Sequence, residues 1–217
     1  MINATGLRWI LTALFVLPAL HALWLAARPG RTLPNRVGHL LHAVMGGAMA
    51  AMAWPWGMDL PTDPQVVLFS VAAVWFAATA TLRSPATDSL RTRLLAAVPH
   101  VVMMLAMAWM AAVMDGSAMG SGGSGGGHHD MEGMDMSATG AISVMSLTGA
   151  GQQWTAALLA VVLTALGLLW LSQAFDRGRV VTAPGRGAAV PVRAEAAEPA
   201  CHGAMAVGMA VMFVLLL

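Results

Sequence analysis

Six long apolar segments, separated by more polar connections, decide what this chain can fold into. Each contains about 17–21 residues, so a helix rising 1.5 Å per residue is long enough in each case to cross a hydrocarbon core of about 30 Å. Only 10% of the 217 residues are charged, whereas soluble domains carry about 25%. The sequence therefore predicts an all-α, polytopic membrane protein, a single integral domain over residues 1–217 with transmembrane helices at about 7–27, 37–56, 66–82, 94–114, 154–174 and 199–217.

Arginine is concentrated in the first, third and fifth connections between these segments. Those connections hold all but one of the eleven arginines, while the second and fourth hold none and carry acidic residues instead. Because basic loops stay in the cytoplasm, the pattern predicts that both ends of the chain lie outside. The lack of lysine, with abundant alanine and glycine, is typical of a high-GC bacterial genome, so we expect a multi-pass protein of the bacterial inner membrane.

A cleaved secretory signal is the alternative interpretation of the first segment, because Arg8 precedes its apolar run. Cleavage would leave Arg28, Arg31 and Arg36 outside, against the charge rule. We therefore interpret the first segment as an uncleaved helix.

A histidine followed by methionines at offsets of 3, 7 and 10 occurs three times, as H-x-x-M-x-x-x-M-x-x-M. At 100° per residue these four side chains fall on one narrow face of a helix, and they span about 15 Å along it. We call each copy a His–Met ladder. The second, fourth and sixth segments carry the ladders: His42, Met45, Met49 and Met52; His100, Met103, Met107 and Met110; and His202, Met205, Met209 and Met212.

The three ladders fall on helices that are predicted to run in the same direction, from the cytoplasm to the outside. The other three helices run the opposite way and carry no ladder, so the chain reads as three helical hairpins. We expect these hairpins to surround a pseudo-threefold axis, with the ladders facing one another. The histidines would then share one level near the cytoplasm, and the methionines would rise towards the outside.

The residue types in the ladder favour copper. Thioether sulfur is a soft, uncharged donor that selects Cu(I), and it avoids the cost of burying a carboxylate in the membrane. Neutral imidazoles bind copper as well, and Cys201, beside His202, can add a thiolate. The alternative is packing, since methionine is a common core filler. Packing, however, does not require a histidine in every copy, and ionisable residues inside a membrane are usually functional.

Further candidate ligands lie outside the ladders. His39 precedes His42 by three residues, and it either faces the same site or lies at the membrane interface; His21 is more simply a hydrogen-bonding group between helices. Residues 115–150 are rich in glycine and serine and predict a flexible outer loop, and 176–198 predict a flexible cytoplasmic linker. The outer loop contains a short tract that can bind metal above the methionine ends of the ladders: His128, His129, Met131, Met134 and Met136.

Two resemblances rest on these stretches. The Met-x-x-x-Met pairs, such as Met45 with Met49, resemble those lining the pore of Ctr-type eukaryotic copper transporters, which are trimers of three-helix subunits with methionine-rich outer segments. The stretches 39–56, 99–110 and 201–212 resemble an actinobacterial family of small polytopic membrane proteins with a domain of unknown function. The first resemblance implies a methionine-lined pore for copper, and the second implies the fold and lineage only.

Together these features predict a membrane Cu(I)-binding protein that transports, relays or stores copper through a central His/Met site. Its expected partners are the lipid bilayer, the copper ion and a copper-carrier protein on the periplasmic or cytoplasmic side; nothing indicates nucleic acid. A haem-binding electron carrier is one alternative, because His and Met are axial haem ligands. A metal-free scaffold with methionine-rich packing is another. No acid–base constellation stands out in the spans, so we do not expect an enzyme.

Overall fold

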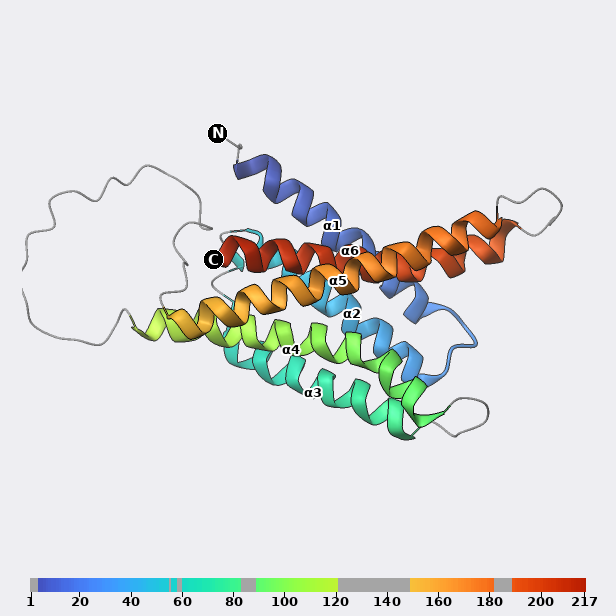
Figure 1. Cartoon of the computed structure of the whole chain (residues 1–217), viewed down its shortest axis with the longest axis horizontal. Helices are drawn as coiled ribbons and strands as arrows, with labels where there is room; N and C mark the ends of the chain where they lie inside the picture. Colours follow the sequence, from blue (N-terminus) through green and yellow to red (C-terminus); the bar gives the residue numbers. More distant parts are fainter. Residues whose placement is uncertain (1–3, 55, 58–59, 83–88, 121–148, 182–188) are drawn as a thin grey trace, which may run out of the picture.

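The computed structural model describes residues 4–54, 56–57, 60–82, 89–120, 149–181 and 189–217. Within that part the chain forms six α-helices and no strand, which confirms the all-α prediction. The helices run roughly along the long axis of the molecule, and the start of α1 lies at the same end as the end of α6 (Figure 1). Their bounds are α1 Ala4–Ala27, α2 Leu33–Met52, α3 Thr62–Leu82, α4 Leu90–Gly120, α5 Ala150–Val181 and α6 Ala189–Leu216.

Five of the six helices, all except α2, are long and apolar enough to cross a membrane. Helix α2 has the length, but its first half contains Asn35, Arg36, His39 and His42, and two glycines lie in the rest. Its polar side chains are largely enclosed, since His39 and His42 are both buried. The helix that falls short in hydropathy is therefore one whose polar face is covered by protein.

Each helix packs mainly along its neighbour in the sequence: α1 along α2, α3 along α4, and α5 along α6. A further contact joins α1 to α6. Glycines allow the closest of these approaches, because a Cβ at Gly203 would lie 2.9 Å from Leu171 Cγ and one at Gly167 would lie 2.7 Å from Val207 Cγ2. Small residues of this kind are typical of helix interfaces in membranes, where backbones approach closely.

Methionine and alanine make up most of the centre of the bundle, together with a few large side chains such as Phe15, Phe69 and Phe213, while many leucines, valines and tryptophans lie on its outside. The ladder residues Met49, Met103, Met107 and Met209 are completely buried. Large apolar side chains on the other helices, such as Val71 of α3, are well exposed. A soluble protein does not expose so much apolar surface, so this distribution fits a bilayer environment.

The predicted segment boundaries and flexible linkers need correction. Helix α5 continues to Val181 and α6 begins at Ala189, so most of the linker expected at 176–198 is helical. Alanine and arginine are good helix formers, and proline is tolerated in a first helical turn, which explains the extension. Helix α4 likewise continues to Gly120, into the outer loop expected at 115–150. The tract of His128, His129, Met131, Met134 and Met136 lies outside the described residues.

Candidate metal centre

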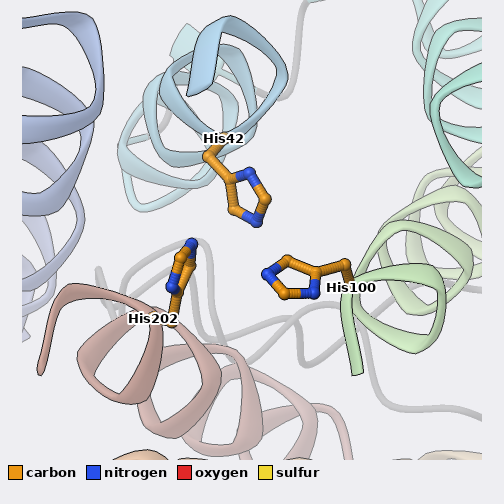
Figure 2. Close-up of side chains that lie close together, drawn as sticks. All are labelled: His42, His100 and His202. Atoms are coloured by element: carbon orange, nitrogen blue, oxygen red, sulfur yellow. The ribbon is translucent and has the colours of Figure 1, made fainter. Parts of the chain in front are cut away.

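Three histidines from three helices converge at one point in the bundle. His42 of α2, His100 of α4 and His202 of α6 each offer one ring nitrogen, and these nitrogens all lie within 4.8 Å of one another. Figure 2 shows the three rings pointing towards a common centre. Their centroids are 4.7–5.2 Å apart, and the rings meet edge to face. We call this group the histidine triad.

Backbone carbonyls orient two of the three imidazoles. His42 Nδ1 lies 2.8 Å from the Gly38 carbonyl oxygen, and His100 Nδ1 lies 3.2 Å from that of Ala96. A carbonyl can only accept, so in each ring Nδ1 carries the hydrogen and Nε2 keeps a free lone pair. His42 Nε2 is buried without a hydrogen-bond partner among the described residues. An imidazole held in this way, with Nδ1–H on a carbonyl and Nε2 free, is prepared to bind a metal ion.

The triad nitrogens are close to the spacing that a single ion requires. Metal–nitrogen bonds to histidine are about 2.0–2.1 Å long, so three nitrogens around one ion lie about 3.5 Å apart. The upper limit of 4.8 Å between the nitrogens is therefore about 1 Å longer than the spacing around a bound ion. Small rotations of the histidine side chains would close this difference.

Two aromatic side chains enclose the triad from the helices that carry no ladder. Phe76 of α3 stacks on His100 with centroids 5.3 Å apart and meets His42 edge-on at 5.2 Å. Trp170 of α5 lies 5.4 Å from His202 and 5.5 Å from His100. Sequence reasoning missed both, and no shared spacing could have found them, because Phe76 precedes His100 by 24 residues and Trp170 precedes His202 by 32.

The ladder methionines continue inwards from the triad and are almost completely enclosed. Seven of the nine are no more than 2% exposed, and the other two, Met52 and Met212, are partly buried against the same core. Met205 of the α6 ladder packs against α2, since a Cβ at Gly46 would lie 2.9 Å from Met205 Cε, and the buried ladder methionines of all three helices belong to one core cluster. Thioether sulfurs from different helices therefore share one dry interior.

Met104 is equally buried and was not singled out from the sequence. It follows His100 by four residues, which is outside the ladder offsets, yet its side chain is completely enclosed. Met104 lies one residue beyond the ladder position Met103, so the ladder spacing could not reveal its burial.

A cavity of about 500 Å³ reaches the triad from the arginine-rich end of the bundle. All three triad histidines and Phe76 line it, together with His39. Its remaining polar lining comes from Arg31, Asn35, Thr79, Thr92, Arg93 and Glu198. The triad thus separates a polar cavity from the methionine interior.

The two other predicted ligands near the triad lie at its edge. His39 is 8% exposed, and Cys201 is a partly buried free thiol. In the described part of the chain, only His42, His100 and His202 gather closely enough to form a metal-binding group of such residues. His39 and Cys201 therefore adjoin this group without belonging to it.

A helical bundle with apolar outer faces and a converging histidine triad defines a polytopic membrane protein with a candidate metal centre. The chain belongs to the family described as "Domain of unknown function (DUF5134)", which matches residues 34–216. This confirms the predicted membership of a domain-of-unknown-function family.

Three relatives come from mycobacteria, which confirms the actinobacterial lineage. They include "Uncharacterized protein Rv0970" of Mycobacterium tuberculosis and "Uncharacterized protein Mb0995" of Mycobacterium bovis. Each is 46% identical over 120 residues, which is 53% of this chain and 53% of the relative. The chain therefore matches about half the length of these relatives. No solved structure matches it.

Proposed function

We propose that this protein binds Cu(I) in the membrane and transports or relays it between the histidine triad and the methionine ladders. The observation that carries the proposal is the convergence of His42, His100 and His202, each at the base of a ladder. The triad imidazoles, two of them held by backbone carbonyls, lie at the inner end of the polar cavity. The buried methionine thioethers lie further along the same helices, beyond the cavity. The chain's own role is to bind and pass on an ion, and we do not assign it a catalysed reaction.

The donor types favour Cu(I) over other ions. Nine thioethers are poor ligands for hard or borderline divalent ions, whereas Cu(I) accepts sulfur and imidazole together. Offsets of three or four residues place successive methionine levels about 4.5–6 Å apart along a helix. An ion held by one level can therefore exchange to the next in short steps, without a charged side chain in the interior.

We also infer that all six helices span the membrane, as three hairpins around a pseudo-threefold axis. The pairing of α1 with α2, α3 with α4 and α5 with α6 supports this arrangement. The low hydropathy of α2 is compatible with spanning because its polar face is buried against the other helices. The positive-inside rule then places the arginine-lined cavity on the cytoplasmic side and both chain ends outside.

The copper ion would be exchanged with soluble carriers at one or both ends of this path. The Met-x-x-x-Met pairs resemble those of Ctr-type transporters, and this likeness supports a shared principle of thioether relay. In our proposal the outer tract at residues 128–136 adds ligands above the ladder. The two alternatives that the experiment must distinguish from this proposal are a haem-binding electron carrier and a metal-free scaffold.

The test is Cu(I) binding by purified full-length protein in detergent, without oxygen, in competition with a chromogenic Cu(I) chelator. Two neighbouring substitutions give a matched pair, because Met103 and Met104 lie on the same helix and are both completely buried. Leucine conserves most of the volume, so the fold should tolerate either change. We expect Met103→Leu to weaken Cu(I) binding at least about tenfold and Met104→Leu to leave it within about twofold.

Three results would count against the proposal. Wild-type protein that binds no Cu(I) and shows no haem absorption supports the scaffold. A Soret band in the purified protein supports the haem carrier. Equal Cu(I) affinities for the Met103→Leu and Met104→Leu variants would show that the ladder methionines are not the copper ligands, even if copper binds elsewhere.

A further inference from the structure

A second, much smaller cavity lies beside the triad, between α1, α2 and α6. Its volume is about 10 Å³, which is close to the least space that holds one water molecule or ion. Seven of its ten lining residues carry a nitrogen, sulfur or carboxylate donor. Four of these donors are additional to the ladders: His21, His39, Glu198 and Cys201.

This small cavity is connected to the triad through shared walls. His42 and His202 line it, so two triad histidines border both the cavity and the triad, and Met205 of the α6 ladder lines it as well. His100 does not line it, whereas it lines the large cavity. The small cavity extends towards α1 and the large one towards α3 and α4, and both are lined by His39, His42, Glu198 and His202.

An unpartnered ring nitrogen lies on a residue that lines this cavity. His21 Nε2 is buried without a hydrogen-bond partner among the described residues, whereas His42, which also lines the cavity, has its unpartnered Nε2 in the triad. Buried polar atoms without partners are costly, and they usually face an ordered water or an ion. Thiol and imidazole around a space of this size favour a soft metal ion over water alone.

We propose that this cavity is a second Cu(I) site, the transfer site, in which Cys201 and His21 hold the ion before it passes to the triad. The inference rests on the proposed function and adds a route of access to it. Binding replaces the thiol proton of Cys201, which leaves for solvent as the copper–sulfur bond forms, and no electron is transferred. The ion then exchanges onto His42 and His202, which border both sites.

The spacing of the donors suits a transient site. They are not gathered as closely as the triad, which is the one close group in the described part of the chain. A site whose ligands must move to close around the ion releases it more readily than a preorganised one. The triad, with two imidazoles fixed by backbone carbonyls, would then be the tighter acceptor.

The experiment uses full-length protein in detergent under anaerobic conditions, with Cu(I) supplied as its acetonitrile complex. The bound copper per chain is measured together with the rate at which iodoacetamide alkylates Cys201, the only cysteine. We expect Cu(I) to slow alkylation at least about tenfold in wild type and in His100→Leu. In His21→Leu this protection should fall, and both His21→Leu and Cys201→Ser should bind one Cu(I) fewer than wild type.

The outcomes separate the two proposals. If wild type binds no Cu(I), the proposed function itself fails. If it binds Cu(I) but Cys201 reacts equally fast with and without copper, and Cys201→Ser and His21→Leu keep the wild-type stoichiometry, then the transfer site alone is refuted. If the Cys201 thiol does not react even without copper, the number of bound Cu(I) ions alone is decisive: one fewer in His21→Leu and Cys201→Ser supports the transfer site, and the wild-type number refutes it.

Discussion

The two halves of the three laddered helices differ in the donors they carry and in their access to water. At the arginine-rich end, imidazoles border a polar cavity of about 500 Å³. Beyond the triad the donors are thioethers, and the first two methionines of each ladder are at most 1% exposed. Groups that exchange protons lie where water reaches them, and donors that need neither charge nor hydrogen bonds lie in the dry interior.

This division gives each half a different sensitivity to substitution. The histidine half depends on orientation, through the carbonyls of Gly38 and Ala96. The methionine half depends on close packing, through small residues such as Gly46. Substitutions that disturb one half without the other test whether the division is real.

The largest expected effect comes from removing a triad nitrogen. His42→Leu takes away the most buried imidazole and leaves an apolar side chain of similar size, so Cu(I) affinity should fall about a hundredfold or more. Competition with a chromogenic Cu(I) chelator measures it. Leu40→Ala, on an exposed position of the same helix, is the control and should bind as wild type. An unchanged affinity for His42→Leu would exclude the triad as the copper site.

The next effect tests the packing of the methionine half. A Cβ at Gly46 would lie 2.9 Å from both Ala19 Cβ and Met205 Cε, whereas one at Gly47 would meet nothing within 4 Å. Gly46→Ala should therefore lower the free energy of unfolding by about 1–3 kcal/mol, measured by denaturation with sodium dodecyl sulfate. Gly47→Ala is the matched control, and the same measurement should show no loss. Equal losses in both variants would contradict the close contact of α2 with α6.

How far the sequence could anticipate the structure also differs between the halves. The ladder spacing predicted that three histidines from the even-numbered segments would converge, and they do, because helical periodicity carries a face through the whole segment. The enclosure of the triad by Phe76 and Trp170 was not predictable, since it depends on how separate helices register against each other. The small cavity lined by His21 was missed for the same reason.

One error came from treating composition as structure. The linker at 176–198 was expected to be flexible from its Arg, Ala, Pro and Gly content, but alanine and arginine extend both flanking helices. Helix α2 is different: it stays a proposed span, and its polar residues reduce its hydropathy below that of the other five helices. Its burial explains why the polar residues are tolerated.

A smaller effect tests the aromatic enclosure of the triad. Phe76→Leu removes the ring that stacks on His100 and allows the imidazoles to reorient, so Cu(I) affinity should fall about tenfold. Phe69→Leu changes another buried phenylalanine of α3 that is absent from the ring contacts of the triad. That variant should bind as wild type in the same chelator competition. A similar loss in both would mean that packing of α3, and not the stacking, matters.

The smallest effect concerns the charges of the large cavity. Arg31 lines it, and a positive charge there opposes the approach of a cation through water. Arg31→Gln should raise the rate of Cu(I) binding about two- to threefold in low salt, and the gain should vanish near 1 M salt, where charges are screened within about 3 Å. Stopped-flow mixing measures the rate. A gain that persists in high salt would show that the charge is not its cause.

X-ray absorption at the copper edge, on protein loaded with one equivalent of Cu(I), tests the central claim most directly. If the triad and the first methionines hold the ion together, the spectrum will show Cu(I) with nitrogen ligands at about 2.0 Å and sulfur ligands at about 2.3 Å, distances like those of zinc sites. In Met45→Leu/Met103→Leu/Met205→Leu protein the sulfur contribution should be lost or greatly reduced. A spectrum that is the same in both proteins would contradict a site built from histidine and methionine on facing helices.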